Sequence, residues 1–212
     1  MSVRGRPESY LIEGGQRHLI LDRNYISERG LRWDTDLVWI FRGNLLRIPV
    51  GAPVGSAKFS TISVTPSSGT GATATFTALY RNDAGFDQFS LVQLYLPGND
   101  GGGDNACWVY YEPGTNTLWL RKDGQNGALG PLTPGGTPGS KPSVENTQCA
   151  LHAAGSLVSG SGTDLTVTYA ISFKPAFAGA RSVLLYAQDL AWRGTGWEAR
   201  GVWSVPPDRE VR

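Results

Sequence analysis

Residues 106–121 read ACWVYYEPGTNTLWLR and give the clearest indication of the fold class. Two short runs of aromatic and aliphatic residues flank Pro-Gly-Thr-Asn, whose members are turn formers. In the first run, alternate residues point to opposite faces of a strand. If Cys107 points inward, Val109 and Tyr111 do too, whereas Trp108 and Tyr110 point outward. The stretch therefore predicts two antiparallel strands that share an apolar inner face and an aromatic outer face.

The same pattern of short apolar runs separated by turn formers extends over most of the chain, which has almost no helical periodicity. We expect strands near 58–65, 72–80, 89–96, 106–112, 117–121, 148–152, 164–173, 182–188 and 197–205. Clusters of Gly, Pro, Asn, Asp and Ser separate them. Many short strands at this spacing predict an all-β fold, an immunoglobulin-like antiparallel β-sandwich. Residues 123–146 are rich in Gly and Pro, so a surface excursion is favoured there over a strand pair.

Composition divides the chain into three parts: a small β-rich N-terminal module at 1–55, the sandwich at 56–206, and a polar tail at 207–212. The tail is either a linker or an arm that docks on a neighbour. Within the module, apolar runs around Glu13-Gly14-Gly15 predict a hairpin. A helical turn over 25–29, capped by Asp22 and ended by Gly30, follows. The remaining expectations are strands at 37–41 and 45–50, with a turn at 42–44.

The charge balance restricts the partners. Among 212 residues the formal net charge is +1 and charged residues make up 17%. A net charge so close to zero argues against nucleic acid or an anionic membrane as the main partner. No stretch approaches 18 consecutive apolar residues, so we expect no membrane insertion. Residues 1–7 lack the apolar core of a secretory signal, so the chain either is not exported by that route or is a fragment restarted with Met.

The two cysteines, Cys107 and Cys149, are either buried free thiols or a disulfide that closes a loop of roughly forty residues. The enclosed stretch is poor in core residues, which favours the disulfide and an oxidising compartment. Two cysteines and two distant histidines, His18 and His152, have no metal-ligand spacing.

Two resemblances to known families add to this interpretation. About residues 58–205 resemble an immunoglobulin-like β-sandwich module repeated in large surface proteins of soil bacteria. The residues that carry the match are 63–69, 105–111, 116–120, 148–151, 157–162, 173–179, 196–197 and 201–205. The resemblance implies a Cys107–Cys149 disulfide and no established chemistry. About residues 8–52 resemble a short repeat of bacterial extracellular proteins, through 10–15, 17–18, 20, 30–31, 33 and 48–51.

Candidate catalytic and metal-binding groups are sparse. His18 and His152 lie outside any Gly-x-Ser-x-Gly context and are interpreted as structural histidines. Glu112 and Glu198 could form a carboxylate pair, but surface carboxylates are favoured. We therefore expect no enzyme. Calcium is a weak possibility at the acidic turns, which are ordinary turn formers too: Asn82, Asp83, Asp87, Asn99, Asp100 and Asp104. No other cofactor is expected.

The aromatic residues are the most informative set. Core positions for Leu118 and Leu120 place Trp119 and Arg121 outward, and Gln93 and Tyr95 share a face of their own strand. If the strands are neighbours, one sheet face carries Tyr95, Gln93, Trp108, Tyr110, Trp119 and Arg121. Such a face stacks on sugar rings, buries a protein partner, or is covered by the first module.

The C-terminal tryptophans extend this set. Trp192 lies in an expected exposed loop and is a candidate contact residue. Trp197, Trp203 and Val205 would share a face in a regular strand, so at least one of the two tryptophans is expected in the core.

These features predict a non-catalytic bacterial surface or secreted module for recognition or adhesion, which binds a glycan or a protein through the aromatic face or loops. The alternative is a structural self-assembling subunit, either a virion decoration or tail protein or an extracellular filament. We expect an extracellular or cell-surface location, or the virion if Met1 is the native start.

Overall fold

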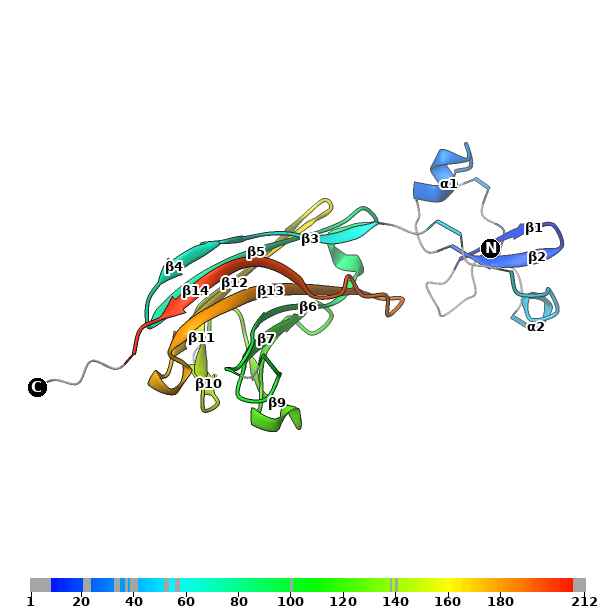
Figure 1. Cartoon of the computed structure of the whole chain (residues 1–212). Helices are drawn as coiled ribbons and strands as arrows, with labels where there is room; N and C mark the ends of the chain where they lie inside the picture. The colour runs from blue at the N-terminus through cyan, green and yellow to red at the C-terminus, as the bar shows by residue number, and fades with distance from the viewer. Residues whose placement is uncertain are drawn as a thin grey trace, which may run out of the picture. The chain divides into compact units, whose positions relative to one another are not determined.

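The structure is a computed structural model that describes residues 9–20, 24–32, 35–36, 38, 42–51, 54–55, 58–99, 101–137, 139 and 141–207. The chain divides into two compact units, Met1–Lys58 and Phe59–Arg212 (Figure 1). Each unit is described by itself. Almost all of the expected polar tail, 208–212, lies outside the described residues.

The first unit contains the expected hairpin. Strand β1 (Tyr10–Glu13) pairs antiparallel with β2 (Gln16–Leu19). Gly14 and Gly15 join them with φ of 58° and 76°, which suits a tight two-residue hairpin turn. Helix α1 (Asn24–Glu28) then confirms the expected helical turn, and Gly30 follows it at φ 73°. The expected cap Asp22 lies outside the described residues.

The second half of this unit differs from the expectation. Residues 42–45 form a helical turn, α2 (Arg42–Leu45), so the turn expected at 42–44 followed by a strand over 45–50 is wrong. Pro49 cannot donate to a strand ladder. Among the described residues after α2, the pairing with the hairpin consists of isolated parallel bridges, Arg17↔Val50 in β2 and Ile20↔Val54 just after it. Most of the strand expected at 37–41 lies outside the described residues.

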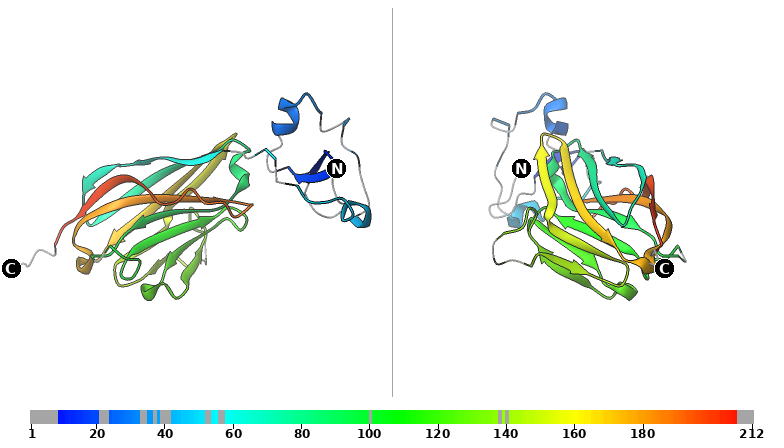
Figure 2. Two further views of the ribbon diagram at one scale, coloured as in Figure 1. Left: turned by 45° about the vertical axis from the view of Figure 1, so that its right-hand side comes forward. Right: turned by 90° about the vertical axis from the view of Figure 1, so that its left-hand side faces the viewer.

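The second unit is an antiparallel sandwich of two sheets, which Figure 2 shows from two further sides. Over the described residues, one sheet has the order β10 (Ser143–Glu145), β11 (Cys149–Ser161), β12 (Asp164–Phe173), β5 (Thr73–Asn82), β3 (Phe59–Thr65). The other has the order β4 (Ser68–Thr70), β14 (Glu198–Val205), β13 (Gly179–Asp189), β6 (Phe89–Leu96), β7 (Cys107–Glu112), β8 (Thr117–Arg121), β9 (Ala128–Leu132). Only the β4–β14 pairing among these is parallel.

Short 3-10 turns link some of these strands: η1 (Phe86–Gln88), η2 (Asp123–Gln125) and η3 (Pro175–Phe177). The all-β sandwich is confirmed, while the likeness to the immunoglobulin fold in particular stays a prediction.

Residues 123–146 correct one expectation, because the segment contains strands as well as loop. β9 extends the seven-stranded sheet and β10 extends the five-stranded sheet. Leu132 explains the first of these, since it is buried opposite Leu118 of β8. The segment therefore crosses from one sheet to the other and adds an edge strand to each.

Strand β11 is longer than expected and contains a bulge, because its pairing with β12 resumes at Leu157. Its register on β12 shifts between His152 and Leu157. The Ser156 hydroxyl donates to the His152 carbonyl at 2.6 Å and accepts from the Ala170 N–H at 3.0 Å. The side chain thereby satisfies backbone groups that the bulge separates.

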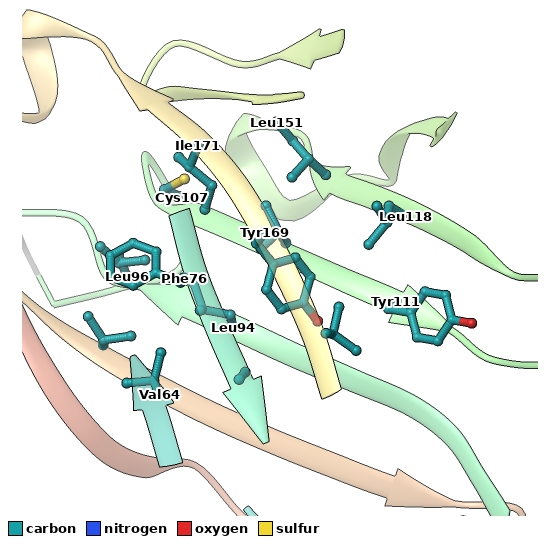
Figure 3. Close-up of a cluster of buried hydrophobic side chains, with 14 of the residues drawn as sticks. Val64, Phe76, Leu94, Leu96, Cys107, Tyr111, Leu118, Leu151, Tyr169 and Ile171 are labelled. Atoms are coloured by element: carbon teal, nitrogen blue, oxygen red, sulfur yellow. The ribbon is translucent and has the colours of Figure 1, made fainter. Parts of the chain in front are cut away.

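The core lies between the two sheets and consists mainly of alternate residues from their longer strands (Figure 3). Tyr80 and Tyr169 reach across it from the five-stranded sheet. Their hydroxyls donate to the β6 carbonyls of Gln93 at 2.9 Å and Val92 at 3.3 Å, respectively. Both tyrosines are fully buried, so these bonds stabilise the pairing of the sheets without leaving a polar atom unsatisfied.

The disulfide Cys107–Cys149 is confirmed, and it joins β7 of one sheet to β11 of the other. The two Cα atoms are 5.7 Å apart and the residues are 42 positions apart in sequence. Both cysteines are fully buried, so the bond is a covalent link between the layers of the sandwich.

Candidate functional site

The outer face of the seven-stranded sheet brings together the aromatic residues singled out from the sequence. The inner positions Leu94, Val109 and Leu120 are fully buried, so their strand neighbours point away from the core. The register pairs these outward residues across β6, β7 and β8: Tyr95↔Trp108, Gln93↔Tyr110 and Tyr110↔Trp119. Arg121 ends β8 on the same face.

Two more aromatic residues join this face. Tyr186 of β13 is paired with Gln93, and alternation with the buried Leu185 and Ala187 could have placed it outward. Trp197, at the start of the β14 chain segment, is 39% exposed. We call these seven residues the aromatic face: Tyr95, Trp108, Tyr110, Trp119, Arg121, Tyr186 and Trp197.

A β-bulge explains why Trp197 is outward. Gly201 is opposite Val183 and Ala199 is opposite Leu184, so Arg200 is an extra residue in β14. An extra residue reverses the alternation on one side of it. Trp203 therefore points into the core, where it is 8% exposed, and confirms that one of these tryptophans is a core residue. In the sequence of β14, Gly201 was the only local signal of this bulge.

Four rings of the aromatic face form one group of mutual contacts. Trp197 has its ring centroid 5.3 Å from that of Tyr186, 5.0 Å from Tyr95 and 5.5 Å from Trp108. Tyr95 and Trp108 are themselves 5.2 Å apart. The tilted and edge-on geometries are those that aromatic pairs prefer.

Tyr110 and Trp119 form a second group farther along the sheet. Their centroids are 6.3 Å apart and their planes differ by 13°. Burial raises the pKa of Tyr110, and the nearby Glu112 carboxylate adds to the rise, whereas the Arg121 guanidinium opposes it. The Tyr110 hydroxyl therefore stays neutral at physiological pH.

Hydrogen bonds fix the orientation of several rings. The Trp108 indole N–H donates to the Gln93 side-chain carbonyl at 2.6 Å, and the Trp119 indole N–H donates to the Thr117 hydroxyl at 3.0 Å. The Tyr95 hydroxyl donates to the Gly102 carbonyl at 2.7 Å. Because these donors are already used, the rings present mainly their π faces and edges to a ligand.

Arg121 lies over the rings between the two groups. Its guanidinium carbon is 4.9 Å from the Trp108 ring centroid and 5.8 Å from that of Tyr110. Such positions favour a cation–π attraction. The Nε atom is buried and has no hydrogen-bond partner among the described residues. The face therefore carries a positive charge that is held in place by rings.

Trp192 lies in the loop between β13 and β14, as expected, and is 79% exposed with φ 64°. The Asp189 carboxylate holds this loop by accepting from the backbone N–H groups of Ala191 at 3.0 Å and Arg193 at 2.9 Å. The loop also meets the aromatic face, because a Cβ on Gly194 would lie 2.2 Å from the Tyr186 hydroxyl.

The other candidate groups have structural surroundings. His152 shares a 2.8 Å hydrogen bond with Ser172 on the neighbouring strand. Glu198 bonds to Thr61 and to Arg200, while Glu112 lies three strands away, about 14 Å or more at the usual strand spacing. This exceeds the separation of roughly 5–9.5 Å between the carboxylates of glycosidases.

The acidic turn at Asn82, where ordinary turn formers were favoured over a calcium site, is closed by a hydrogen bond from the Ala84 N–H to the Asn82 side-chain oxygen at 3.0 Å. Within the described ranges, no group of three or more His, Cys, Asp and Glu residues is arranged to hold a metal ion. Asp100 lies outside those ranges.

The sequence matches no protein-family model and no curated protein. The helices found in the described part of the chain are too short and too polar to cross a membrane.

Proposed function

We propose that the protein is a non-catalytic recognition or adhesion module of a bacterial surface or secreted protein, and that it binds a glycan through the aromatic face. The observation that carries the proposal is the pair of ring groups on neighbouring strands, one from Tyr186 to Trp108 and the other of Tyr110 and Trp119, with Arg121 over a ring of each. Sugar rings have apolar C–H faces, and aromatic rings held by a rigid sheet bury them at little cost in side-chain entropy.

The size of the face favours a glycan over a protein. None of its six aromatic residues is more exposed than Trp197, at 39%. A Trp or Tyr side chain has about 150–250 Å² of surface, so together they expose less than about 600 Å². A stable protein interface needs about 800 Å² from each partner, whereas a few sugar units need less.

The disulfide supports a location outside the cytoplasm. Buried disulfides persist in oxidising compartments such as the periplasm and the cell surface. Cys107 and Cys149 form one that joins the two sheets. The resemblance to bacterial surface modules points to the same compartment.

A glycan-binding screen of the full chain tests this function. We expect a polysaccharide ligand whose binding is lost in the Trp108→Ala/Trp119→Ala double variant. The single variants Trp119→Ala and Tyr110→Ala should each weaken binding at least tenfold, and thermal unfolding checks that they are folded. Trp192→Ala is the matched control, because it removes an exposed tryptophan from the neighbouring loop.

Three outcomes would contradict the proposal. Binding that survives in the double variant would place the site elsewhere. Loss of binding only in Trp192→Ala would move the site to the loop. Absence of glycan binding, together with rings or filaments in light scattering and electron microscopy, would favour the alternative of a self-assembling structural subunit.

A further inference from the structure

We propose that the glycan is acidic and that its carboxylate group binds Arg121. This inference rests on the proposed function and names the ligand class of the same face. It comes from the surroundings of one guanidinium group, which differ from those of the other arginines in the sandwich.

The other described arginines of the unit Phe59–Arg212 have acceptors inside the protein. Arg81 is bidentate to Asp164 at 2.6 and 2.8 Å, Arg193 is paired with Asp189, and Arg200 is paired with Glu198 at 2.7 Å. Arg181 donates to the carbonyls of Phe177 and Ala178.

Arg121 alone in this described set has neither a carboxylate nor a carbonyl acceptor. Its Nε atom is removed from water without a partner. It is instead held against Trp108 and Tyr110.

A cation that is partly removed from water and has no hydrogen-bond acceptor binds an anion favourably. Burying a charge without a partner is costly, and hydrogen bonds to ionised groups are about twice as strong as neutral ones. The planar guanidinium of Arg121 is already oriented by two rings, so less side-chain entropy is lost when a ligand binds. A ligand that supplies the anion therefore gains more here than at the paired arginines.

The position of Arg121 ties the anion to a sugar. The guanidinium lies over Trp108, which in turn contacts Tyr95 and Trp197. A sugar unit that stacks on this group of rings has its edge substituents beside Arg121. A carboxylate on that edge matches the fork of the guanidinium, as in uronic-acid sugars.

Glu112 sets the charge pattern that the face accepts. It follows Trp108 by four residues on the same side of β7, about 13 Å away at the usual rise per residue. Its carboxylate repels negative charge at that end of the face. The arrangement therefore favours a chain with its acidic group at the Arg121 end over a dense polyanion.

The test compares acidic polysaccharides with neutral versions of the same backbone. Alginate, polygalacturonate and hyaluronate are each titrated against the full chain beside their carboxyl-reduced forms, with sulfated carrageenan as a separate anion. We expect at least one carboxylated form to bind tenfold or more tightly than its reduced form. This preference should shrink as salt concentration rises.

Substitutions locate the charge effect. Arg121→Gln should abolish the preference for the acid form and lower its affinity by about 10–100-fold, the range for a lost hydrogen bond to a charged group. Arg121→Lys, which keeps the charge but not the fork, should retain part of the preference. Arg81→Gln is the matched control, since it removes the same charge from the outer face of the five-stranded sheet and should leave binding unchanged.

The outcomes separate this inference from the proposed function. Equal binding of acid and reduced forms, with loss in the tryptophan variants, would overturn the acidic ligand and keep the glycan-binding function. Binding of carrageenan but of no carboxylated form would also overturn it. Failure of every polysaccharide to bind would overturn both.

Discussion

Trp197 and Trp203 lie on opposite faces of the seven-stranded sheet, although an even number of residues separates them. Trp203 packs its ring 5.4 Å from that of Phe76 in the core, and its indole N–H donates to the Gly71 carbonyl at 3.0 Å. Trp197 contacts the rings of Tyr95 and Tyr186 outside the core. Because Arg200 is an extra residue in β14, the two side chains point to opposite faces. Trp203 is therefore a structural residue, and Trp197 is a candidate binding residue.

Alanine substitution should therefore affect these two tryptophans differently. Trp203→Ala should lower the free energy of unfolding by about 3–5 kcal/mol, because it leaves a cavity beside Phe76. Trp197→Ala should cost only about 1–2 kcal/mol, from lost ring contacts at the surface. Urea unfolding of both variants measures the difference, and equal losses would show that Trp197 is a core residue too.

The sequence predicted the strands that are rich in bulky residues and missed those that are not. Residues 89–96, 117–121 and 164–173 have the predicted bounds, because aliphatic and aromatic residues are concentrated in them and turn-forming residues flank them. Strands β9 and β10 were missed, since short edge strands are held by their neighbours more than by their own pattern.

The candidate site shows the same division. Alternation placed Trp108, Tyr110 and Trp119 on one face, and the register of β6, β7 and β8 brings them together. Trp197 could not be placed in the same way, because a bulge depends on pairing with another strand. Arg121 was placed on the face, but its lack of an acceptor is a property of the three-dimensional surroundings alone.

Loss of the disulfide should destabilise the sandwich. Cys107 and Cys149 are 42 positions apart. In the chain-entropy model, closing a loop of that length lowers the entropy of the unfolded chain and so raises its free energy by about 4 kcal/mol. The Cys107→Ala/Cys149→Ala variant should lose about this much free energy of unfolding. Chemical denaturation of the wild type under reducing conditions provides a second measurement. A variant as stable as the oxidised wild type would contradict the prediction.

Gly201 allows β4 to approach β14. A Cβ at this position would lie 2.3 Å from the backbone carbonyl oxygen of Ser67, and backbone cannot move aside as a flexible side chain can. Gly201→Ala should therefore cost about 1–3 kcal/mol of stability, the range for overpacking. Gly114→Ala is the matched control, because nothing lies within 4 Å of its Cβ position and its φ is not in the left-handed region. Thermal unfolding compares the two, and a similar small effect in both would contradict the close approach.

The buried tyrosines should make the fold sensitive to alkaline pH. Burial raises the pKa of Tyr80 and of Tyr169 above the ordinary value of 10. Below about pH 10 both hydroxyls are protonated in the folded and the unfolded chain, so stability is unaffected by them. As the pH rises above 10, the unfolded chain loses these protons first, and the folded state loses about 1.4 kcal/mol per pH unit for each tyrosine.

Guanidinium unfolding between pH 8 and pH 11 measures this dependence. The free energy of unfolding of the wild type should fall steeply above pH 10. Tyr80→Phe should reduce that slope by the contribution of one tyrosine, about 1.4 kcal/mol per pH unit. The double variant with Tyr169→Phe should reduce it by about two such contributions, even though each variant is less stable at pH 8 because the hydroxyls no longer bond to the Gln93 and Val92 carbonyls. Comparing slopes and not absolute stabilities cancels the contributions of all other groups that titrate in this range. An unchanged slope in the double variant would show that neither hydroxyl is withheld from water in the native state.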